Sequence, residues 1–223
     1  MESQAVNISR EMRIFSLPRK LYRYFREEGG ESFLTRAASD ILSPIYKSKK
    51  VIIYKNEGIS NEKGKFENVI KEQINVRMAL SEDIDELEKI MYQGRSEIEK
   101  RFKRGNRCFI ACIGTKIVHY TWVSFNKEYL TSINKWIELA EDEAYIYNVR
   151  TLSDFRGQGI FQFVLISLCN QLRMDGYKKI LSSVLSDNLP SQKAFEKSGF
   201  VKSKEISYLR VFGYKRYDFK ELN

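Results

Sequence analysis

A glycine-bearing turn, Arg156-Gly157-Gln158-Gly159, combines residue types that bind phosphate groups. Residues 144–151 before it predict a β-strand, and the residues after it have the apolar stripe of a long helix. The first turn of a helix presents backbone N–H groups that lack partners within the helix, and the helix dipole adds to their attraction for an anion. Glycine lets the backbone approach a phosphate closely, and Arg156 would add a charge-assisted contact. The turn is therefore a candidate phosphate cradle, although both glycines would also suit a turn that serves packing alone.

A second pattern follows the predicted helix. A strand is predicted at residues 179–184, and after it come Asn188, Ser191 and the stretch Phe195-Glu196-Lys197-Ser198-Gly199-Phe200. The two patterns, in this order and with one helix and one strand between them, resemble those of the GNAT superfamily of acyl-CoA-dependent N-acyltransferases. The resemblance covers residues 143–200.

Each motif of that family is met with one departure. The coenzyme motif, Arg/Gln-x-x-Gly-x-Gly/Ala, is matched by Arg156 and Gly159, while Phe161 takes the place of the small residue. The downstream motif, Asn-x-x-Ala/Ser-x-x-x-Tyr-Glu-Lys-x-Gly-Phe, is matched over residues 188–200, except that Phe195 replaces the tyrosine. We expect the Phe161 side chain to point into the core, because it belongs to the apolar stripe of the helix.

The resemblance implies that acetyl-CoA is the co-substrate and that three parts of the chain bind it. Backbone groups of the strand before the turn pair with the pantetheine arm, the turn and the first helical residues donate to the diphosphate, and Asn188 bonds the arm or holds the parted strand. A helix cap before Pro190 is the alternative role for Asn188. The residues that the resemblance assigns to coenzyme binding are Val149, Arg150, Thr151, Leu152, Arg156, Gly157, Gln158, Gly159, Ile160, Phe161, Asn188, Ser191 and Phe195.

Acyl transfer to an amine also needs a base for the amine and an acid for the departing thiolate. In the family the base is commonly a carboxylate or a water-linked polar group on the strand that enters the turn. Glu143 and Tyr145 lie on one face of that strand by alternation, and we predict them as catalytic residues, with a solvated strand end as the alternative for Glu143. Phe195 cannot protonate the thiolate, but a thiol with a pKa of about 8.5 is a tolerable leaving group. His119 would titrate near neutrality or be a packed, hydrogen-bonded core histidine.

The elements around these residues favour an α/β (α+β) fold. Residues 74–78 alternate like a strand, Ser81 offers an N-cap for a helix, and residues 96–103 predict a charged helix. A hairpin is predicted around Gly114, and residues 126–139 are expected to be partly helical. Two further strands end the chain. The resemblance implies a GNAT-type mixed, mostly antiparallel sheet with helices on both faces.

The chain is predicted to consist of a helical N-terminal extension (residues 1–70) and an acetyltransferase domain (residues 71–223). Residues 17–25 and 32–45 have helical spacing, residues 51–54 are a short strand candidate, and residues 56–65 have the composition of a linker. We expect the extension to pack on the domain or on a second copy of the chain in a homodimer. A basic helix lying on a membrane is the alternative.

Composition limits the partners and the compartment. The net charge of +9 suits an anionic partner, for which coenzyme A suffices, and the 38 basic residues are interleaved with 29 acidic ones, so nucleic-acid binding is not expected. Three cysteines without CxxC spacing favour a reduced intracellular chain, and a single histidine argues against a His-rich metal site. The sequence lacks a signal-peptide apolar core and a bilayer-length apolar run. We expect a cytoplasmic protein that uses no metal and no membrane.

The function predicted from the sequence is acetyl transfer from acetyl-CoA to a primary amine, by direct attack in a ternary complex. The acceptor, a small molecule or a peptide, is left open by the sequence, as are the acyl chain length and the oligomeric state. The first alternative is a GNAT-fold module that binds acyl-CoA without turning it over, which Phe161 and Phe195 would favour. The second is a nucleic-acid or ribosome-associated protein that uses the basic N-terminal helix.

Overall fold

A computed structural model describes residues 45–58 and 74–222 of the chain. The helices predicted at residues 17–25 and 32–45, and the linker predicted at residues 56–65, lie wholly or largely outside the described residues. The chain divides into two compact units, Lys49–Tyr208 with Tyr217–Asn223, and Met1–Ser48 with Leu209–Arg216. The division predicted at residue 70 stays a prediction.

Eight strands form the main sheet, in the order β10-β9-β1-β8-β7-β4-β3-β2. Among the pairs β1–β8, β2–β3, β3–β4, β4–β7 and β7–β8, the last is parallel and the others are antiparallel. The mixed, mostly antiparallel sheet implied by the resemblance is thus confirmed. The strands are β1 (Tyr46–Asn56), β2 (Ile74–Met78), β3 (Arg107–Ile113), β4 (Lys116–Ser124), β7 (Glu143–Thr151), β8 (Lys179–Leu185), β9 (Val201–Val211) and β10 (Tyr214–Glu221).

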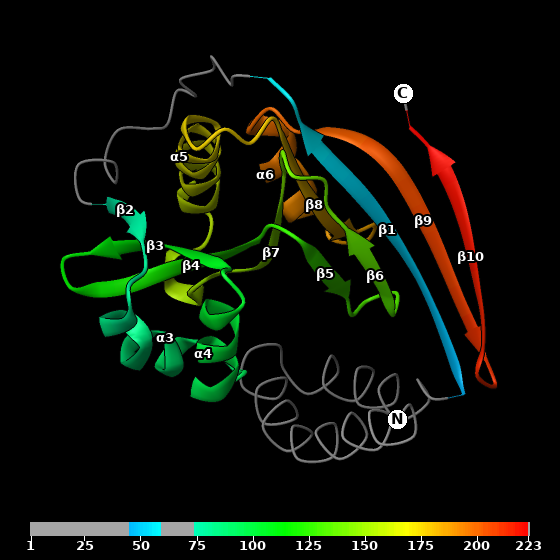
Figure 1. Cartoon of the computed structure of the whole chain (residues 1–223), viewed down its shortest axis with the longest axis horizontal. Coiled ribbons are helices and arrows are strands. Elements are labelled where there is room, and N and C mark those ends of the chain that lie inside the picture. Colours follow the sequence, from blue (N-terminus) through cyan, green and yellow to red (C-terminus); the bar gives the residue numbers. More distant parts are fainter. Residues whose placement is uncertain (1–44, 59–73, 223) are drawn as a thin grey trace. The chain divides into compact units, whose positions relative to one another are not determined.

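Helices cover both faces of the sheet, as expected. One hydrophobic cluster joins residues such as Val164 and Leu168 to Ile146, and a second joins Leu87 and Ile98 to strand residues on the opposite face. Figure 1 shows α5 on one side of β3 and β4, with α3 and α4 on the other. The helices are α3 (Ile84–Ile90), α4 (Arg95–Lys103), α5 (Ile160–Met174) and α6 (Leu189–Lys197), with single 3-10 turns at η1 (Ser81–Asp83) and η2 (Ser153–Phe155).

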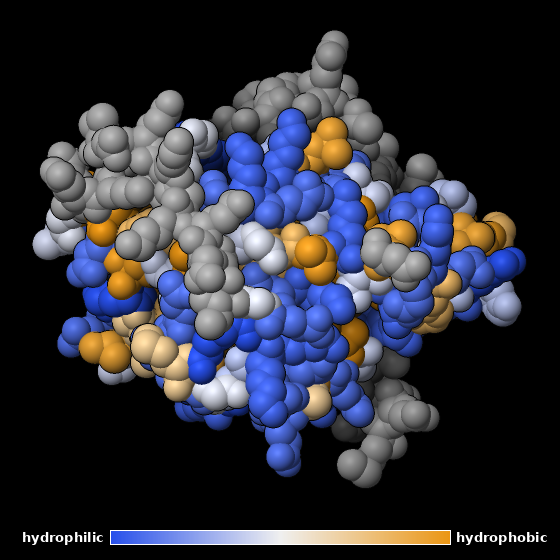
Figure 2. All heavy atoms as spheres, turned by 90° about the horizontal axis from the view of Figure 1, so that it is seen from above, coloured by the Kyte–Doolittle hydropathy of each residue, from blue (hydrophilic) through white to orange (hydrophobic). Residues whose placement is uncertain are grey.

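Strands β3 and β4 are buried along almost their whole length, because helices cover them on both faces. Their hairpin turns at Gly114, whose φ of 57° lies in the left-handed region, as the sequence predicted. The face drawn in Figure 2 is mostly hydrophilic, and the hydrophobic side chains of its described residues lie in small separate groups. Within residues 45–58 and 74–222, no helix combines the length and the apolar character needed to cross a bilayer.

Two local predictions were wrong. Residues 126–139 form a two-stranded hairpin, β5 (Lys127–Leu130) and β6 (Lys135–Glu138), rather than a partly helical segment. Asn134, at φ 51°, closes its turn, and Tyr129 pairs across the strands with Trp136, which favours strands over a helix. Ser81 begins a 3-10 turn instead of capping a helix, and Asp83 Oδ2 accepts the Leu80 N–H at 2.8 Å there.

The strand predicted at residues 51–54 is confirmed and is longer than its apolar core. β1 begins at Tyr46 and reaches Asn56, and its residues from Val51 onward are buried or half-buried. It pairs with β8 from Val51↔Leu185 to Asn56↔Ile180. The strand therefore lies inside the main sheet, although it precedes residue 70 in the chain.

Candidate active site

β7 and β8 pair along only their first residues. The parallel partners run from Glu143↔Lys179 to Ile146↔Ser182. Beyond these, β7 stays paired with β4 and β8 stays paired with β1, so the two strands part from each other, as Figure 1 shows. Parted strands leave N–H and C=O groups on their facing edges, and such groups need partners. The gap is therefore suited to a ligand that can pair with backbone.

A β-bulge lies in β7 where the strands part. Tyr147 faces Trp122 and Arg150 faces Tyr120, so Asn148 and Val149 together oppose a single residue of β4. Asn148 has a φ of 47°, in the left-handed region. A bulge bends its strand and redirects the backbone groups beside it. The irregularity thus falls on the residues that line the gap.

The predicted cradle opens α5 directly after this strand. Gly157 and Gly159 have φ values of 78° and 74°, which residues with a Cβ rarely adopt. The Phe163 N–H donates to Gly159 O at 3.0 Å, as the helical pattern requires. The N–H groups of the turn before Phe163 lie at the helix start, where a helix leaves its N–H groups without internal partners. Arg156 is exposed, and its Nε donates to Thr151 O at 3.2 Å. The glycines and the helix start are arranged as an anion site requires.

A cleft of about 420 Å³ occupies the gap between the parted strands. Phe161 of α5 and the predicted residues of α6 and its N-cap line one part of it, and the β5–β6 hairpin and α4 line another. Its lining consists of Gln93, Arg101, residues 128–132, residues 145–149, Phe161, residues 182–185, Asn188, Ser191 and Phe195.

The sequence profile of the acetyltransferase (GNAT) family matches residues 77–200, more than half of the chain. The chain belongs to the GNAT acetyltransferase family. Two solved structures share the fold of this GNAT protein. An acetyltransferase of the family from Colwellia psychrerythraea is 17% identical, with a TM-score of 0.52, and the match covers 78% of this chain and 57% of that one. A GNAT-family protein from Novosphingobium aromaticivorans DSM 12444 is 9% identical, with a TM-score of 0.53 and coverages of 79% and 66%.

This GNAT chain thus spans less than two thirds of the length of either structural relative. No sequence among the curated proteins matches it significantly. At these identities the solved structures establish the fold alone. The roles of individual site residues must therefore be argued from the geometry of this chain.

Phe161 and Phe195, the two departures from the family motifs, pack against each other at the cleft. Their rings meet edge to face at 5.4 Å, and Phe195, which is 2% exposed, also stacks on Tyr54 at 5.7 Å. Phe161 is half-buried, packs against the core as predicted, and also borders the cleft. The position of the usual tyrosine is therefore filled by an apolar ring held by aromatic neighbours.

His119 lies beneath the cradle and is fully buried. Its Nδ1 and Nε2 are hydrogen-bonded to the Thr151 and Thr121 hydroxyls at 2.8 and 2.7 Å, and its ring stacks on Phe161 at 5.8 Å. Burial lowers the pKa of His119 to about 3. Of the two roles considered for it, the packed core histidine is the one that the structure supports.

The two predicted catalytic residues are separated. Glu143 lies at the start of β7, outside the cleft lining, where its carboxylate accepts from Lys179 Nζ at 2.7 Å and from the Ala140 N–H at 3.1 Å. Burial raises the pKa of Glu143, but these two hydrogen bonds outweigh it, so that the pKa lies below its ordinary value. Tyr145 does line the cleft, and its buried hydroxyl donates to Ser183 Oγ at 2.5 Å. The structure does not bring Glu143 to the cleft.

Among the predicted coenzyme ligands, Asn188 and Leu152 have partners within the chain. Asn188 is the N-cap of α6, where its Oδ1 accepts the Ser191 N–H at 3.2 Å, and both residues also line the cleft. The Leu152 N–H donates to Val118 O at 2.9 Å, and its oxygen accepts the Phe155 N–H at 3.0 Å. The backbone of Leu152 is thus engaged in the turn, whereas Val149 borders the cleft.

Sequence reasoning missed Glu128 and Arg101, which come from β5 and α4. Both line the cleft together with Tyr147. The Arg101 guanidinium lies over the rings of Tyr147 and Trp122, at 5.1 and 5.2 Å, and its Nε donates to Glu97 at 3.2 Å. The Tyr147 hydroxyl accepts from Asn106 Nδ2 at 2.7 Å. No local motif marks these residues, because they belong to elements outside both family signatures.

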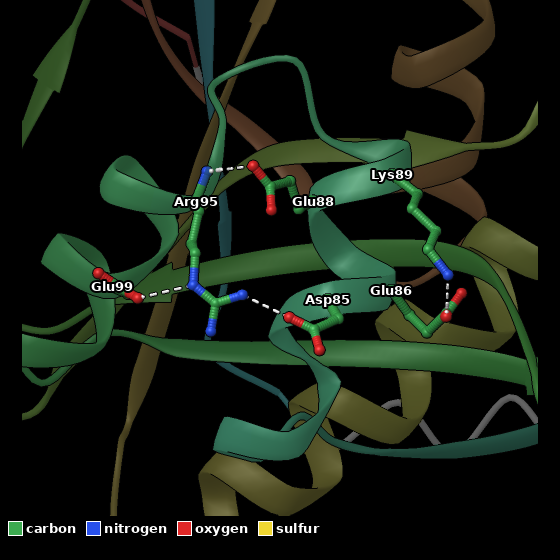
Figure 3. Close-up of polar contacts among 6 residues, drawn as sticks. All are labelled: Asp85, Glu86, Glu88, Lys89, Arg95 and Glu99. Carbon is green, nitrogen blue, oxygen red and sulfur yellow. Dashed lines mark hydrogen bonds and ion pairs between the residues drawn. The ribbon is translucent and has the colours of Figure 1, made fainter.

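Ion pairs fix the helix that presents Arg101. Arg95, at the start of α4, forms an ion pair with Asp85 of α3. It forms a second one with Glu99, one helical turn further along α4, where Nε lies 3.0 Å from Oε1. Its backbone N–H donates to Glu88 at 3.3 Å, and Figure 3 shows these contacts joining the two helices, with the Lys89–Glu86 pair on α3 beside them. Exposed pairs contribute little energy each, so these contacts join α3 to α4 without adding much stability.

Proposed function

We propose that this GNAT protein transfers an acetyl group from acetyl-CoA to a primary amine, and that both substrates meet in the cleft between β7 and β8. The observation that carries the proposal is the parting of these strands after Ile146 and Ser182, directly beside the glycine cradle. A pantetheine arm is an extended chain of amides that can pair with the exposed strand edges. The glycine cradle at the start of α5 supports the proposal because its backbone suits the diphosphate at the end of that arm.

The coenzyme is held largely by the backbone in this proposal. Val149, Arg150 and Thr151 on β7 face the arm, Gly157 to Phe161 face the diphosphate, and Asn188, Ser191 and Phe195 border the arm from α6. These are the residues that the family resemblance assigns to the coenzyme. The backbone of Leu152 is engaged elsewhere in the turn, so it is left out of the proposed binding site.

The reaction is a direct attack of the amine nitrogen on the thioester carbonyl, in which a C–N bond forms and the C–S bond breaks. Phe195 cannot donate a proton to the departing sulfur. The coenzyme therefore leaves as a thiolate and takes its proton from water, which a thiol pKa of about 8.5 permits near neutral pH.

Calorimetric titration with acetyl-CoA, followed by assay of thiol release with a panel of primary amines, tests this function. The panel would contain glucosamine, spermidine, tyramine and an alanyl dipeptide amide. We expect micromolar binding of acetyl-CoA and release of free thiol that depends on one class of amine. Absence of acetyl-CoA binding would overturn the proposal.

A non-catalytic acyl-CoA-binding module is the second candidate, and Phe195 in the acid position is the observation that favours it. The same experiment separates the two candidates. Binding of acetyl-CoA without thiol release by any amine of the panel would favour the module, whereas amine-dependent release would exclude it.

A further inference from the structure

The cleft reaches both faces of the sheet where β7 and β8 part. Ile146 and Ser182 point to the face covered by α5 and α6, while Tyr145, Tyr147 and Ser183 alternate to the opposite face. The cradle and Phe195 are on the first side. An acceptor must then approach the thioester from the second side, where the β5–β6 hairpin and α4 complete the lining.

Glu128 is the one carboxylate among the described residues that line the cleft. It lies on β5, beside Tyr129, and its side chain is half-buried. No described lysine or arginine forms an ion pair with it, in contrast to Glu143, which Lys179 holds outside the cleft. A carboxylate in this position is available to a nitrogen that enters the cleft.

We propose that Glu128 is the general base of the acetyl transfer, and that the β5–β6 hairpin is the element that brings it to the acceptor. The proposal rests on the function proposed above. When the amine nitrogen bonds to the thioester carbon, the adduct carries a positively charged N–H. Glu128 takes that proton, the C–S bond breaks, and the thiolate leaves. The thiolate then gains a proton from water, and Glu128 returns its own proton to water, so that the amide and free coenzyme A are the products.

The charges around Glu128 suit this role. Burial raises the pKa of its carboxyl above the ordinary value. A hydrogen bond from the Tyr129 N–H, the charges of Arg101 and Arg104 and a hydrogen bond from the Ser124 hydroxyl oppose that rise without cancelling it. Tyr145 and Tyr147 of β7 face the same space, and burial raises the pKa of both phenols, so they stay uncharged near neutral pH. A carboxylate whose pKa is nearer to neutrality accepts a proton more readily than an ordinary one.

The other titratable candidates are less suited. Both nitrogens of His119 are hydrogen-bonded to threonine hydroxyls beneath the cradle, and its pKa of about 3 leaves it a weak base. Glu97, the next carboxylate along α4 from Arg101, is hydrogen-bonded to that guanidinium at 3.2 Å and does not line the cleft. Glu128 alone combines position and availability among these three groups.

The test compares Glu128→Gln with Glu138→Gln, which changes an exposed carboxylate on the neighbouring strand β6 of the same hairpin. The assay is thiol release from acetyl-CoA with the panel amine that gives the largest rate, measured from pH 5 to 9. We expect kcat of Glu128→Gln to fall by at least about 100-fold and the acidic limb of the pH profile to disappear. Glu138→Gln should behave like the unchanged protein, and Glu128→Asp should recover part of the rate.

Two readouts keep failure of this inference distinct from failure of the proposed function. The Kd for acetyl-CoA should be unchanged in Glu128→Gln, because the glutamate touches the acceptor and not the coenzyme. In protein labelled with ¹³C at the glutamate carboxyl, the resonance that Glu128→Gln removes should titrate above the other glutamates. A kcat for Glu128→Gln within about threefold of the unchanged protein, with intact coenzyme binding, would overturn the inference and leave the acetyltransferase function standing.

Discussion

The two halves of the cleft are built by different means. The half that we propose for the coenzyme is bounded by a parted strand pair and a bulge, and the two left-handed glycines follow at the start of α5, so backbone geometry defines it. The acceptor half consists of side chains from α4 and β5, namely Arg101, Glu128 and the residues around them. Backbone geometry tolerates many side chains and can serve many members of a family. A half made of side chains can change with every substitution, and it is there that the acceptor of each enzyme must be selected.

The largest effect expected on the coenzyme half comes from Gly159→Asp. A carboxylate at this position would face the diphosphate of the coenzyme, and the left-handed φ of 74° adds strain. We expect the Kd for acetyl-CoA to rise by at least about 100-fold, or about 2.7 kcal/mol, while the fold survives. Calorimetry and the thermal midpoint measure the two properties.

Gly176→Asp is the matched control for that variant. Gly176 follows the other end of α5, has a φ of 96°, and a Cβ there would meet open space. Its substitution carries a similar strain without approaching the cradle, so its Kd should match that of the unchanged protein. Equal losses in the two variants would show that strain in α5, and not charge at the cradle, weakens binding.

His119 makes the coenzyme half sensitive to acid. Its pKa is about 3 in the folded protein and about 6.5 when unfolded, so below pH 6.5 the unfolded chain gains a proton that the folded chain does not. The free energy of unfolding should fall by about 1.4 kcal/mol for each pH unit below 6.5 from this residue alone. Urea unfolding at pH 7.5, 6.5 and 5.5 measures it.

His119→Gln should remove this part of the pH dependence, and the interpretation is simple because the chain has a single histidine. The amide keeps a donor and an acceptor for the Thr151 and Thr121 hydroxyls. If the two proteins lost stability in parallel between pH 6.5 and 5.5, His119 would not be held neutral in the folded state.

Asn188 is the point where a structural role and a binding role coincide, and Asn188→Ser separates them from Asn188→Ala. Loss of the N-cap in the alanine variant should cost about 1 kcal/mol of stability, which the serine hydroxyl should largely restore. If the amide also bonds the pantetheine arm, the serine variant should still bind acetyl-CoA several-fold more weakly. Full recovery of both properties in the serine variant would leave Asn188 as a cap alone.

The smallest effect concerns the acceptor half. Arg104 is exposed and lowers the pKa of Glu128 through its charge alone, so Arg104→Gln should shift the acidic limb of the rate profile to higher pH. Coenzyme affinity should not change. Raised salt should shift the unchanged protein in the same direction, because it screens the same interaction. A limb that moves to lower pH would show that Glu128 does not govern it.

The sequence predicted the local conformations of the proposed coenzyme half, but not those of the proposed acceptor half. Gly157, Gly159 and Asn188 are recognisable because one local conformation, a left-handed turn or a helix cap, requires their residue types. The hairpin that carries Glu128 was predicted to be partly helical, because its apolar residues fit a helical spacing. The contact between its two aromatic rings forms only once the two strands pair, so the sequence does not show it. The contact of Arg101 with Tyr147 depends on tertiary packing that no local pattern encodes.

Strand β1 was recognised in the sequence, but its place in the sheet was not. Its apolar core predicts a strand, whereas the register with β8 joins residues from opposite ends of the chain. The family motifs begin after it, so neither the patterns nor the resemblance indicated which strands it would separate. Pairings between residues this far apart in the chain are non-local contacts, which no local sequence pattern encodes.

The position of β1 between β8 and β9 has a consequence for how the protein can be made and cut. β1 leaves the ribosome long before either neighbour exists, so its backbone groups must wait unpaired until synthesis is nearly complete. Its Tyr54 also stacks on Phe195, and its Asn56 donates to Gly199 O at 3.0 Å. A protein started at residue 71 would keep every motif of the family and lack a strand from the middle of its sheet. Removal of the first 44 residues is the shorter cut, and it spares every strand of the sheet as described for residues 45–58 and 74–222.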